Sequence, residues 1–439
     1  MSSQVVFLSL FLGLLAGPHV VEMQVGPAVK SLRILLDDRP VAVLQQRPWR
    51  ATIDFGTAIV PSELIAVGYD ATGSEVGRAK QLLNVPRPVA EFNITLQNDD
   101  AGVPAAAQFR WEHLMAAEAV STSLLVDGKS VPMDRKGAAR LPRLDMKHPH
   151  VISGEIKFDD GFVTRREMVI GGAVTDTADA EMTPVGVRQP AAAAPANLTD
   201  CVTSNGAPLR IAAVEKAPAQ VIFVLDPDPT DALRALNPQL TAGYLWAERL
   251  EARRLVMLDP GTWMRILYPV AERYQSTSNA PSTLFPPSKD VDSASAGLVW
   301  LLTRAYDQYV GDNLPRRFAD AAGVAGLNAI TGAHRRAVVL VLSRRDDAST
   351  HSAASVRRYL ASIGVPLYVW SLSGPSPALR ETWGEVDDIS SLPRLKAAAD
   401  RLRADLASQR VAWVAADPIT ALRLQSTGRC GITPLAAPR

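Results

Sequence analysis

An acidic loop after a hydrophobic run is the stretch of the sequence best suited to chemistry. Residues 221–225 are apolar and mostly β-branched, which is typical of a parallel strand covered on both faces. Asp226 and Asp228 come directly after this run, and the hydroxyl of Thr230 lies two positions further on. Oxygen ligands at alternate positions beyond the carboxyl end of a strand suit a hard divalent cation. The loop therefore raises the hypothesis of a Mg²⁺ or Mn²⁺ site.

The other reactive side chains form no recognisable catalytic set. His148 and His150 could chelate a metal from one strand face, but no third ligand is close to them in sequence. His334 and His351 flank a hydrophobic run and could approach one another, although neither has a nucleophile motif beside it. The sequence also lacks a Gly-x-Ser-x-Gly elbow, a Walker loop, a His-Glu-x-x-His motif and a Cys-x-x-Cys motif. We therefore expect that the protein is not an enzyme.

The elements that would position the acidic loop alternate between strand and helix. The expected strands are residues 220–226, 254–259, 263–268, 336–343, 366–372 and 410–416. The expected helices are residues 296–310, 352–364 and 391–409. Such alternation predicts an α/β, doubly wound, mostly parallel-sheet domain over residues 201–439.

The N-terminal half has a different pattern. Short alternating strands separated by turn signals, such as Asp37-Asp38 and Asp127-Gly128, predict two β-sandwich (Ig-like) domains. We place them at residues 25–89 and 90–172. Residues 173–200 are rich in Ala and Pro without periodicity, so we expect a linker there.

The C-terminal part resembles a von Willebrand factor type A domain. The resemblance rests on "VIFVLDPDPT", on "RRAVVLVLSRRDDASTHSAASVRRYLASIGVPLYVWSL" and on "DRLRADLASQRVAWVA". Together with "PWRATIDFG", "SELIAVGYDATG" and "NVPRPVAE", it makes the chain similar to the bacterial secreted VWFA-related (acidobacterial-type) group. This resemblance implies a fold that binds protein partners at the carboxyl edge of its sheet.

The resemblance also implies a metal-ion-dependent adhesion site, built from an Asp-x-Ser-x-Ser loop, a Thr and a Thr-Asp-Gly loop. Asp226 matches the first carboxylate, while Asp228 and Thr230 stand at the two Ser positions. Ser343, Arg344 and Arg345 occupy the Thr-Asp-Gly positions, with Asp346 and Asp347 further along and Ser293 or Ser295 nearest to the Thr.

Arg344 changes the interpretation of this site. A permanently charged guanidinium at the position of a metal ligand repels the cation and offers Asp226 and Asp228 a partner. We therefore expect a degenerate site in which an ion pair of Arg344 with Asp226 or Asp228 replaces the metal. On this interpretation the protein has no cofactor; the alternative is a working Mg²⁺ or Mn²⁺ site on Asp226, Asp228 and Thr230.

The N-terminal run of residues 5–17 is apolar and too short for an ordinary membrane-spanning helix. It is typical of the hydrophobic region of a secretory signal, which we place at residues 1–24. The alternative is an uncleaved anchor, because the charged region that normally precedes such a run is missing. We therefore expect a secreted or periplasmic protein, in contact with a membrane only through an uncleaved signal.

The two cysteines, Cys201 and Cys430, bracket the C-terminal half. A small, even number of cysteines fits an oxidising compartment, where cysteines pair as disulfides. The two ends of a domain often lie close together, which would bring these two cysteines near each other. The two residues form either a disulfide or two separate buried thiols.

Charge balance narrows the class of partner. The 439 residues contain 46 Lys and Arg against 45 Asp and Glu, a net charge of +1. This balance argues against nucleic acid or an anionic membrane as the main partner, and we interpret the clusters "LPRR" and "AHRRA" as solvated ends of elements. We therefore expect an exported, non-enzymatic protein-interaction (adhesion-type) protein that binds a protein through the loops at 226–230, 343–349 and 372–377. The alternative is an exported hydrolase with an unrecognised site near His334 and His351.

Overall fold

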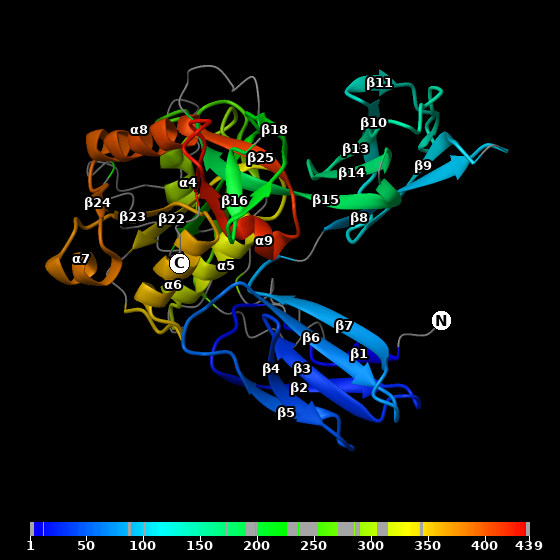
Figure 1. Cartoon of the computed structure of the whole chain (residues 1–439). Helices are drawn as coiled ribbons and strands as arrows, with labels where there is room; N and C mark the ends of the chain where they lie inside the picture. The colour runs from blue at the N-terminus through cyan, green and yellow to red at the C-terminus, as the bar shows by residue number, and fades with distance from the viewer. Residues whose placement is uncertain are drawn as a thin grey trace.

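The structure is a computed structural model of the whole chain, shown in Figure 1. It describes residues 4–435, apart from residues 12, 87–88, 101, 173, 190–197, 199, 226–235, 237–252, 271–284, 286–289, 305–314 and 343–345. For residues 174–181 the backbone alone is described.

The first unit, in blue in Figure 1, packs two antiparallel sheets against each other. One sheet has the order β1 (Val5–Phe7), β2 (Pro18–Val25), β5 (Arg50–Asp54), and the other has the order β4 (Arg39–Leu44), β3 (Ser31–Leu36), β6 (Ser62–Tyr69), β7 (Glu75–Leu83). Fully buried Val21, Leu32 and Leu64 fill the space between the sheets. Asp37 and Asp38 both have positive φ, as a two-residue β3–β4 turn requires. The predicted β-sandwich is confirmed here.

The apolar run at residues 5–17 is part of this unit. Its strand β1 pairs with β2, and Val5 and Leu15 are 1% and 5% exposed. The Leu15 N–H donates to Asn84 Oδ1 at 2.7 Å. A hydrophobic run in which buried and exposed residues mix fits a β-strand and its following loop as well as a leader. Removal of residues 1–24 remains a prediction, and it would take away β1 and most of β2.

The second unit is also a sandwich. One sheet has the order β12 (Ala138–Arg140), β9 (Pro104–His113), β8 (Ala90–Asn98). The facing sheet contains β11 (Lys129–Val131), β10 (Ala119–Val126), β13 (His150–Phe158) and β14 (Val163–Gly171). Phe92, Phe109 and Ile152 pack between the two sheets.

The predicted linker begins with a long strand. Residues Val174–Arg188 form β15, which pairs with β14 through its first half and with β25 (Gln409–Ala415) through its second half. The prediction of a linker throughout residues 173–200 is therefore wrong over this stretch. Composition alone indicated a linker, whereas pairing with strands on both sides makes β15 the middle of an eight-stranded sheet. Figure 1 shows β15 running from the second unit toward β25.

The third unit contains a six-stranded sheet in the order β21 (Val291–Asp292), β20 (Thr262–Leu267), β19 (Ala219–Leu225), β22 (Arg335–Leu342), β23 (Leu367–Ser371), β24 (Asp387–Asp388). Val221 and Phe223 of β19 face α4 (Leu298–Arg304) and α8 (Leu392–Ser408). Ile222 and Val224 face α5 (Phe318–Ala329) and α6 (Ala353–Ser362). All eight residues of β22 are buried, because helices cover both faces and strands flank both edges.

The predicted fold class is nevertheless wrong. Strand pairing in the described chain is mainly antiparallel, and parallel pairs occur only within the six-stranded sheet. The closing strand of the predicted domain, β25, lies outside that sheet and pairs antiparallel with β15 and β18 (Ile211–Glu215). Residues 254–259 form no strand. Residues 201–439 are therefore not a doubly wound von Willebrand factor A-like domain. An apolar run such as that of β25 fits any strand covered on both faces, so the sequence pattern did not reveal its sheet.

The cysteines form the disulfide Cys201–Cys430, with 5.4 Å between their Cα atoms. It ties the start of β16 (Val202–Ser204) to the segment after β26 (Leu424–Ser426), and β16 and β26 are paired strands of one small sheet. Of the two options open from the sequence, the disulfide is confirmed.

The first unit rests on the helices of the third. Ile59 and Leu14 join the apolar cluster of α5 and α6, and the Tyr359 hydroxyl donates to the Asn84 carbonyl at 2.9 Å. Within the described residues, no helix has the length and apolar character needed to cross a membrane.

We predict that Leu15 and Leu10 respond differently to truncation although both belong to the same apolar run. Leu15→Ala should lower the free energy of unfolding by about 2–3 kcal/mol, because the removed side chain leaves a cavity in the core. Leu10→Ala is the matched control, since Leu10 is 57% exposed, and should change it by less than about 0.5 kcal/mol. Urea unfolding measures both. Equal effects of the two substitutions would show that the run does not pack as described.

We predict that the disulfide holds the ends of the C-terminal half together in solution. Its sequence separation is 229 residues. The chain-entropy relation gives about 5 kcal/mol for a loop of that length, so loss of the bond should lower the melting temperature clearly. Thiol alkylation of the denatured, unreduced protein should add no mass. A Cys201→Ala/Cys430→Ala variant should melt like the reduced wild type; uptake of label without reductant would contradict the bond.

Candidate functional site

The predicted ligand edge lies largely outside the described residues. This holds for Asp226, Asp228, Thr230, Ser343, Arg344 and Arg345, and so for the predicted ion pair of Arg344 with Asp226 or Asp228. The remaining candidates are held by the surrounding chain. Ser293 Oγ donates to the Asp259 carbonyl at 2.6 Å, and Ser295 Oγ donates to the Asp292 carbonyl at 2.8 Å. The corrected fold removes the basis for the interpretation as a degenerate metal-ion-dependent adhesion site, which rested on a von Willebrand factor A-like domain.

Asp347 serves the helix beside it. Its carboxylate accepts the N–H groups of Phe318 at 2.9 Å and Ala319 at 3.2 Å, which are donors at the start of α5. A carboxylate at a helix N-terminus satisfies free N–H groups and matches the positive end of the helix dipole. Asp346, the other candidate in this loop, is exposed. The loop after β22 is thus fastened to α5.

Asp320, in the first turn of α5, also binds the loop before α6. Its carboxylate is buried and accepts His351 Nδ1–H at 2.7 Å, the Thr350 N–H at 2.8 Å and Arg317 Nε–H at 2.8 Å. Burial alone would raise the pKa of Asp320, but these hydrogen bonds outweigh it and hold the pKa at about 2. A carboxylate so fully bonded stabilises the loop, and it is a poor proton acceptor at neutral pH.

The two histidines of the hydrolase alternative do not meet. His334 lies just before β22, near Gly332 and the end of α5, whereas His351 follows β22 and contacts Asp320 at the start of α5, so β22 and α5 both run between them. Burial lowers the pKa of His334 to about 4, so its ring is neutral at pH 7. The expectation that they could approach one another is wrong, because the two histidines lie at opposite ends of α5.

His148 and His150 each lie beside a nearby carboxylate. His150 Nδ1 lies 2.7 Å from Asp127 Oδ2, and this hydrogen bond raises the pKa of His150. His148 Nε2 lies 3.8 Å from a different carboxylate, that of Asp145. Across the described ranges, no three His, Cys, Asp or Glu side chains gather as metal ligands would.

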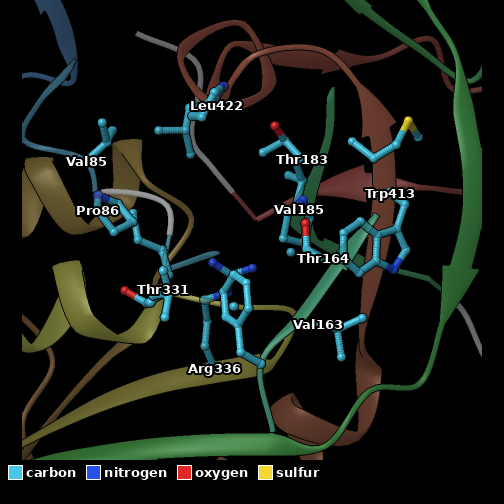
Figure 2. A pocket seen from close by; sticks show the side chains of 18 of the residues that line it. Val85, Pro86, Val163, Thr164, Thr183, Val185, Thr331, Arg336, Trp413 and Leu422 are labelled. Carbon is cyan, nitrogen blue, oxygen red and sulfur yellow. The ribbon is translucent and has the colours of Figure 1, made fainter. Parts of the chain in front are cut away.

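A cavity lies near the amino end of β22, where the three units meet; we call it the inter-unit cavity. Its volume is about 120 Å³. Its wall is formed by Val85, Pro86, Val89 and Ala90 between the first two units, 162–164 at the start of β14, 182–186 of β15, 330–332 after α5, 363–364 after α6, and Pro418 and Leu422 with Trp413. Figure 2 shows these side chains around a common space. Most of the wall is apolar.

Arg336 is the one charged side chain among the described residues of this wall. It is the second residue of β22 and is 2% exposed, and Figure 2 shows its guanidinium at the cavity. Gln409 fixes its backbone, accepting the Arg336 N–H at 2.9 Å and donating to its carbonyl at 3.1 Å. In the described chain, however, Nε and Nη2 of Arg336 have no hydrogen-bond partner. Burial lowers the pKa of Arg336 to about 10, so the group stays cationic at neutral pH.

Gly186 leaves room for this guanidinium. A Cβ at position 186 would lie 3.4 Å from Arg336 Nε and 2.7 Å from Leu435 Cδ1. The second distance is shorter than real side chains tolerate, so a larger residue would push Leu435 or Arg336 aside.

The neighbouring Arg335 is also buried, but its guanidinium is hydrogen-bonded. It is 7% exposed, and it donates from Nε to the Ala217 carbonyl at 2.6 Å and from Nη1 to the Leu406 carbonyl at 2.8 Å. Buried polar groups are nearly always paired in this way, since an unpaired one costs free energy. The Nε and Nη2 groups of Arg336 are the exception here, because both are buried and neither has a hydrogen-bond partner among the described residues.

The sequence interpretation missed this site. It took "AHRRA" for a solvated end, whereas Arg335 and Arg336 are both buried, and Arg316 of "LPRR" is buried as well. The available signal was that two arginines open an uninterrupted apolar strand that helices on both sides would cover.

Comparisons with known proteins add little to this description. No protein-family model matches the chain, and no curated protein matches it. Among solved structures it is similar to the fibronectin(III)-like modules of Clostridium thermocellum CbhA, with 16% identity and a TM-score of 0.16, over 39% of this chain and 96% of that chain. A central fibronectin-III array of RIM-binding protein matches with 10% identity and a TM-score of 0.20, over 44% and 80% of the two chains.

A third solved structure is SGBP-B of the Bacteroides ovatus mixed-linkage glucan utilization locus, in complex with a mixed-linkage heptasaccharide. It has 9% identity and a TM-score of 0.14, over 43% of this chain and 73% of that chain. At such TM-scores the likenesses support no conclusion about function.

We predict that Asp320 stabilises the fold only while it is ionised. A pKa of about 2 against an ordinary 3.8 corresponds to about 2–3 kcal/mol, present above pH 4 and lost as the pH falls toward 2. Asp320→Asn should therefore unfold more easily than wild type at pH 7, and the difference should shrink in acid. Urea unfolding across this range measures it, with the exposed Asp346→Asn as a control that changes little. A deficit in Asp320→Asn that does not depend on pH would contradict the ionised role.

Proposed function

We propose that the chain is an exported, non-catalytic binding protein whose ligand site is the inter-unit cavity. The observation that carries the proposal is Arg336, a buried guanidinium with two free N–H groups at an apolar cavity. Ligand sites in proteins are typically apolar hollows with a few polar groups that fix the ligand's orientation.

The free-energy cost of burying the unpaired Arg336 guanidinium suits a residue that binds a ligand better than one that stabilises the fold. A buried charge without a partner destabilises the folded state, and an apolar residue of similar volume in its place is often neutral or stabilising. An anionic ligand would supply the missing partner.

The chemistry of the wall supports binding and argues against catalysis. A guanidinium that stays protonated cannot act as a general base. The hydroxyls at the wall belong to Thr164, Thr183 and Thr331, and that of Thr183 donates to the Ala416 carbonyl at 2.6 Å. No His, Cys, Asp or Glu occurs among the described lining residues to activate a hydroxyl.

The disulfide supports export. Structural disulfides persist in oxidising compartments and are rare in the cytosol. The Cys201–Cys430 bond therefore fits a secreted or periplasmic location. There a chain with several β-rich units could present its cavity to a protein partner.

We predict that Arg335→Met destabilises the protein and that Arg336→Met does not. Arg335→Met should lower the free energy of unfolding by about 1–3 kcal/mol, because two buried carbonyls lose their donors. Arg336→Met should leave it unchanged or raise it, because a buried charge without a partner is removed. Urea unfolding of the two variants beside wild type measures this.

The same proteins test binding directly. Small anions such as methanesulfonate and acetate should raise the melting temperature of wild type more than that of Arg336→Met, and tetramethylammonium should not. A destabilised Arg336→Met variant, together with no anion effect that depends on Arg336, would show that the residue is structural and would overturn the proposed function.

A further inference from the structure

We infer that the inter-unit cavity takes the carboxylate of a compact apolar acid, either as a free acid or as the C-terminal residue of a protein partner. The inference rests on the proposed function and names the chemistry of its ligand. Three observations carry it: the free edge of Arg336, the lack of a second cation, and the size and character of the wall.

The free N–H groups of Arg336 are on Nε and Nη2. These two groups point the same way from one edge of the planar guanidinium, and their spacing matches the two oxygens of a carboxylate. One bidentate contact would pair both groups at once. Gln409 holds the Arg336 backbone. Gly186 packs beside this edge, since a Cβ there would lie 3.4 Å from Nε and 3.5 Å from Nη2, so a bound carboxylate would have to fit next to Gly186.

The charge of the wall favours a monoanion. No second Lys, Arg or His occurs among the described lining residues, and neighbouring Arg335 is engaged with backbone carbonyls. A phosphate dianion in an apolar cavity would keep an uncompensated charge and several oxygens without donors. A carboxylate on Arg336 leaves no net charge in the cavity.

The rest of the wall fits an apolar group of limited size. Val163, Met182, Val185, Ile363 and Trp413 are among the apolar side chains that line it. The volume of about 120 Å³ is similar to that of cavities of roughly 150 Å³ that hold one benzene molecule. The acid should therefore carry one aromatic ring or a branched aliphatic chain.

The cavity wall reaches the surface. Pro86, Phe162 and Leu422 are half-buried, so part of the wall meets solvent. A peptide could leave the cavity on that side, which is why a C-terminal Phe or Leu of a partner has the same chemistry as a free acid.

Calorimetric titration of the full, disulfide-bonded chain tests the inference. Benzoate should bind with one site per chain, and uncharged benzamide, of the same size, should bind about ten-fold more weakly or worse. Arg336→Met should lose benzoate binding. Arg336→Lys keeps a charge without the fork and should bind benzoate about ten-fold more weakly than wild type. Arg335→Met, outside the cavity, should bind as wild type does.

Two further arms identify the source of the carboxylate. A short peptide ending in Phe with a free carboxylate is compared with its amidated form, and both with benzoate. Tighter binding of the free-carboxylate peptide than of benzoate would support a protein partner, and binding of benzoate alone would support a free acid.

Failure of this inference can be told from failure of the proposed function. If benzamide binds as well as benzoate, or benzenesulfonate binds more tightly than benzoate, the carboxylate assignment is overturned. Binding that still depends on Arg336 would then leave the proposed function in place. Benzoate binding that is unchanged in Arg336→Met would overturn the inference and place the ligand elsewhere.

Discussion

The complete burial of β22 is the constraint on which the rest of the structure depends. Every residue of this strand is covered, so polar groups at its two ends must find partners inside the protein. At the carboxyl end, the carboxylates of Asp347 and Asp320 bind α5 and the loop before α6. At the amino end, Arg335 binds two carbonyls, and Arg336 faces the cavity with two N–H groups free. The carboxyl end of β22 is therefore stabilised by its own hydrogen bonds, whereas the amino end contains the candidate binding site.

The sequence predicted local elements of the fold better than their assembly. The two N-terminal β-sandwiches and the turns at Asp37-Asp38 and Asp127-Gly128 follow from strand period and turn residues. Hydrophobic period says that a run is a buried strand, but it does not say which strands flank it. The run of β25 could therefore be assigned to the parallel sheet, although it lies between β15 and β18. The pairing of β15 was hidden for the same reason, because its partners are far away in sequence.

The candidate site was less predictable than the fold. Acidic residues at alternate positions drew attention to the loop at 226–230, because spacing is visible in a sequence. The inter-unit cavity has no such signal, since its wall combines segments from residue 85 to residue 422. Arg335 and Arg336 are identical residue types at adjacent positions, and only the tertiary contacts of their side chains separate a satisfied guanidinium from a free one. The cysteines are an intermediate case: their even count left a disulfide and two buried thiols both open, and the fold shows that they are bonded.

The most direct measurement is a crystal structure of the full chain soaked with 4-bromobenzoate, in which anomalous scattering locates the bromine. The account predicts a bromine peak among the apolar side chains of the inter-unit cavity, with the carboxylate on Arg336 Nε and Nη2. The same soak of Arg336→Met should give no peak there. An empty cavity in the soaked wild type, or a ligand whose carboxylate points away from Arg336, would contradict the central claim.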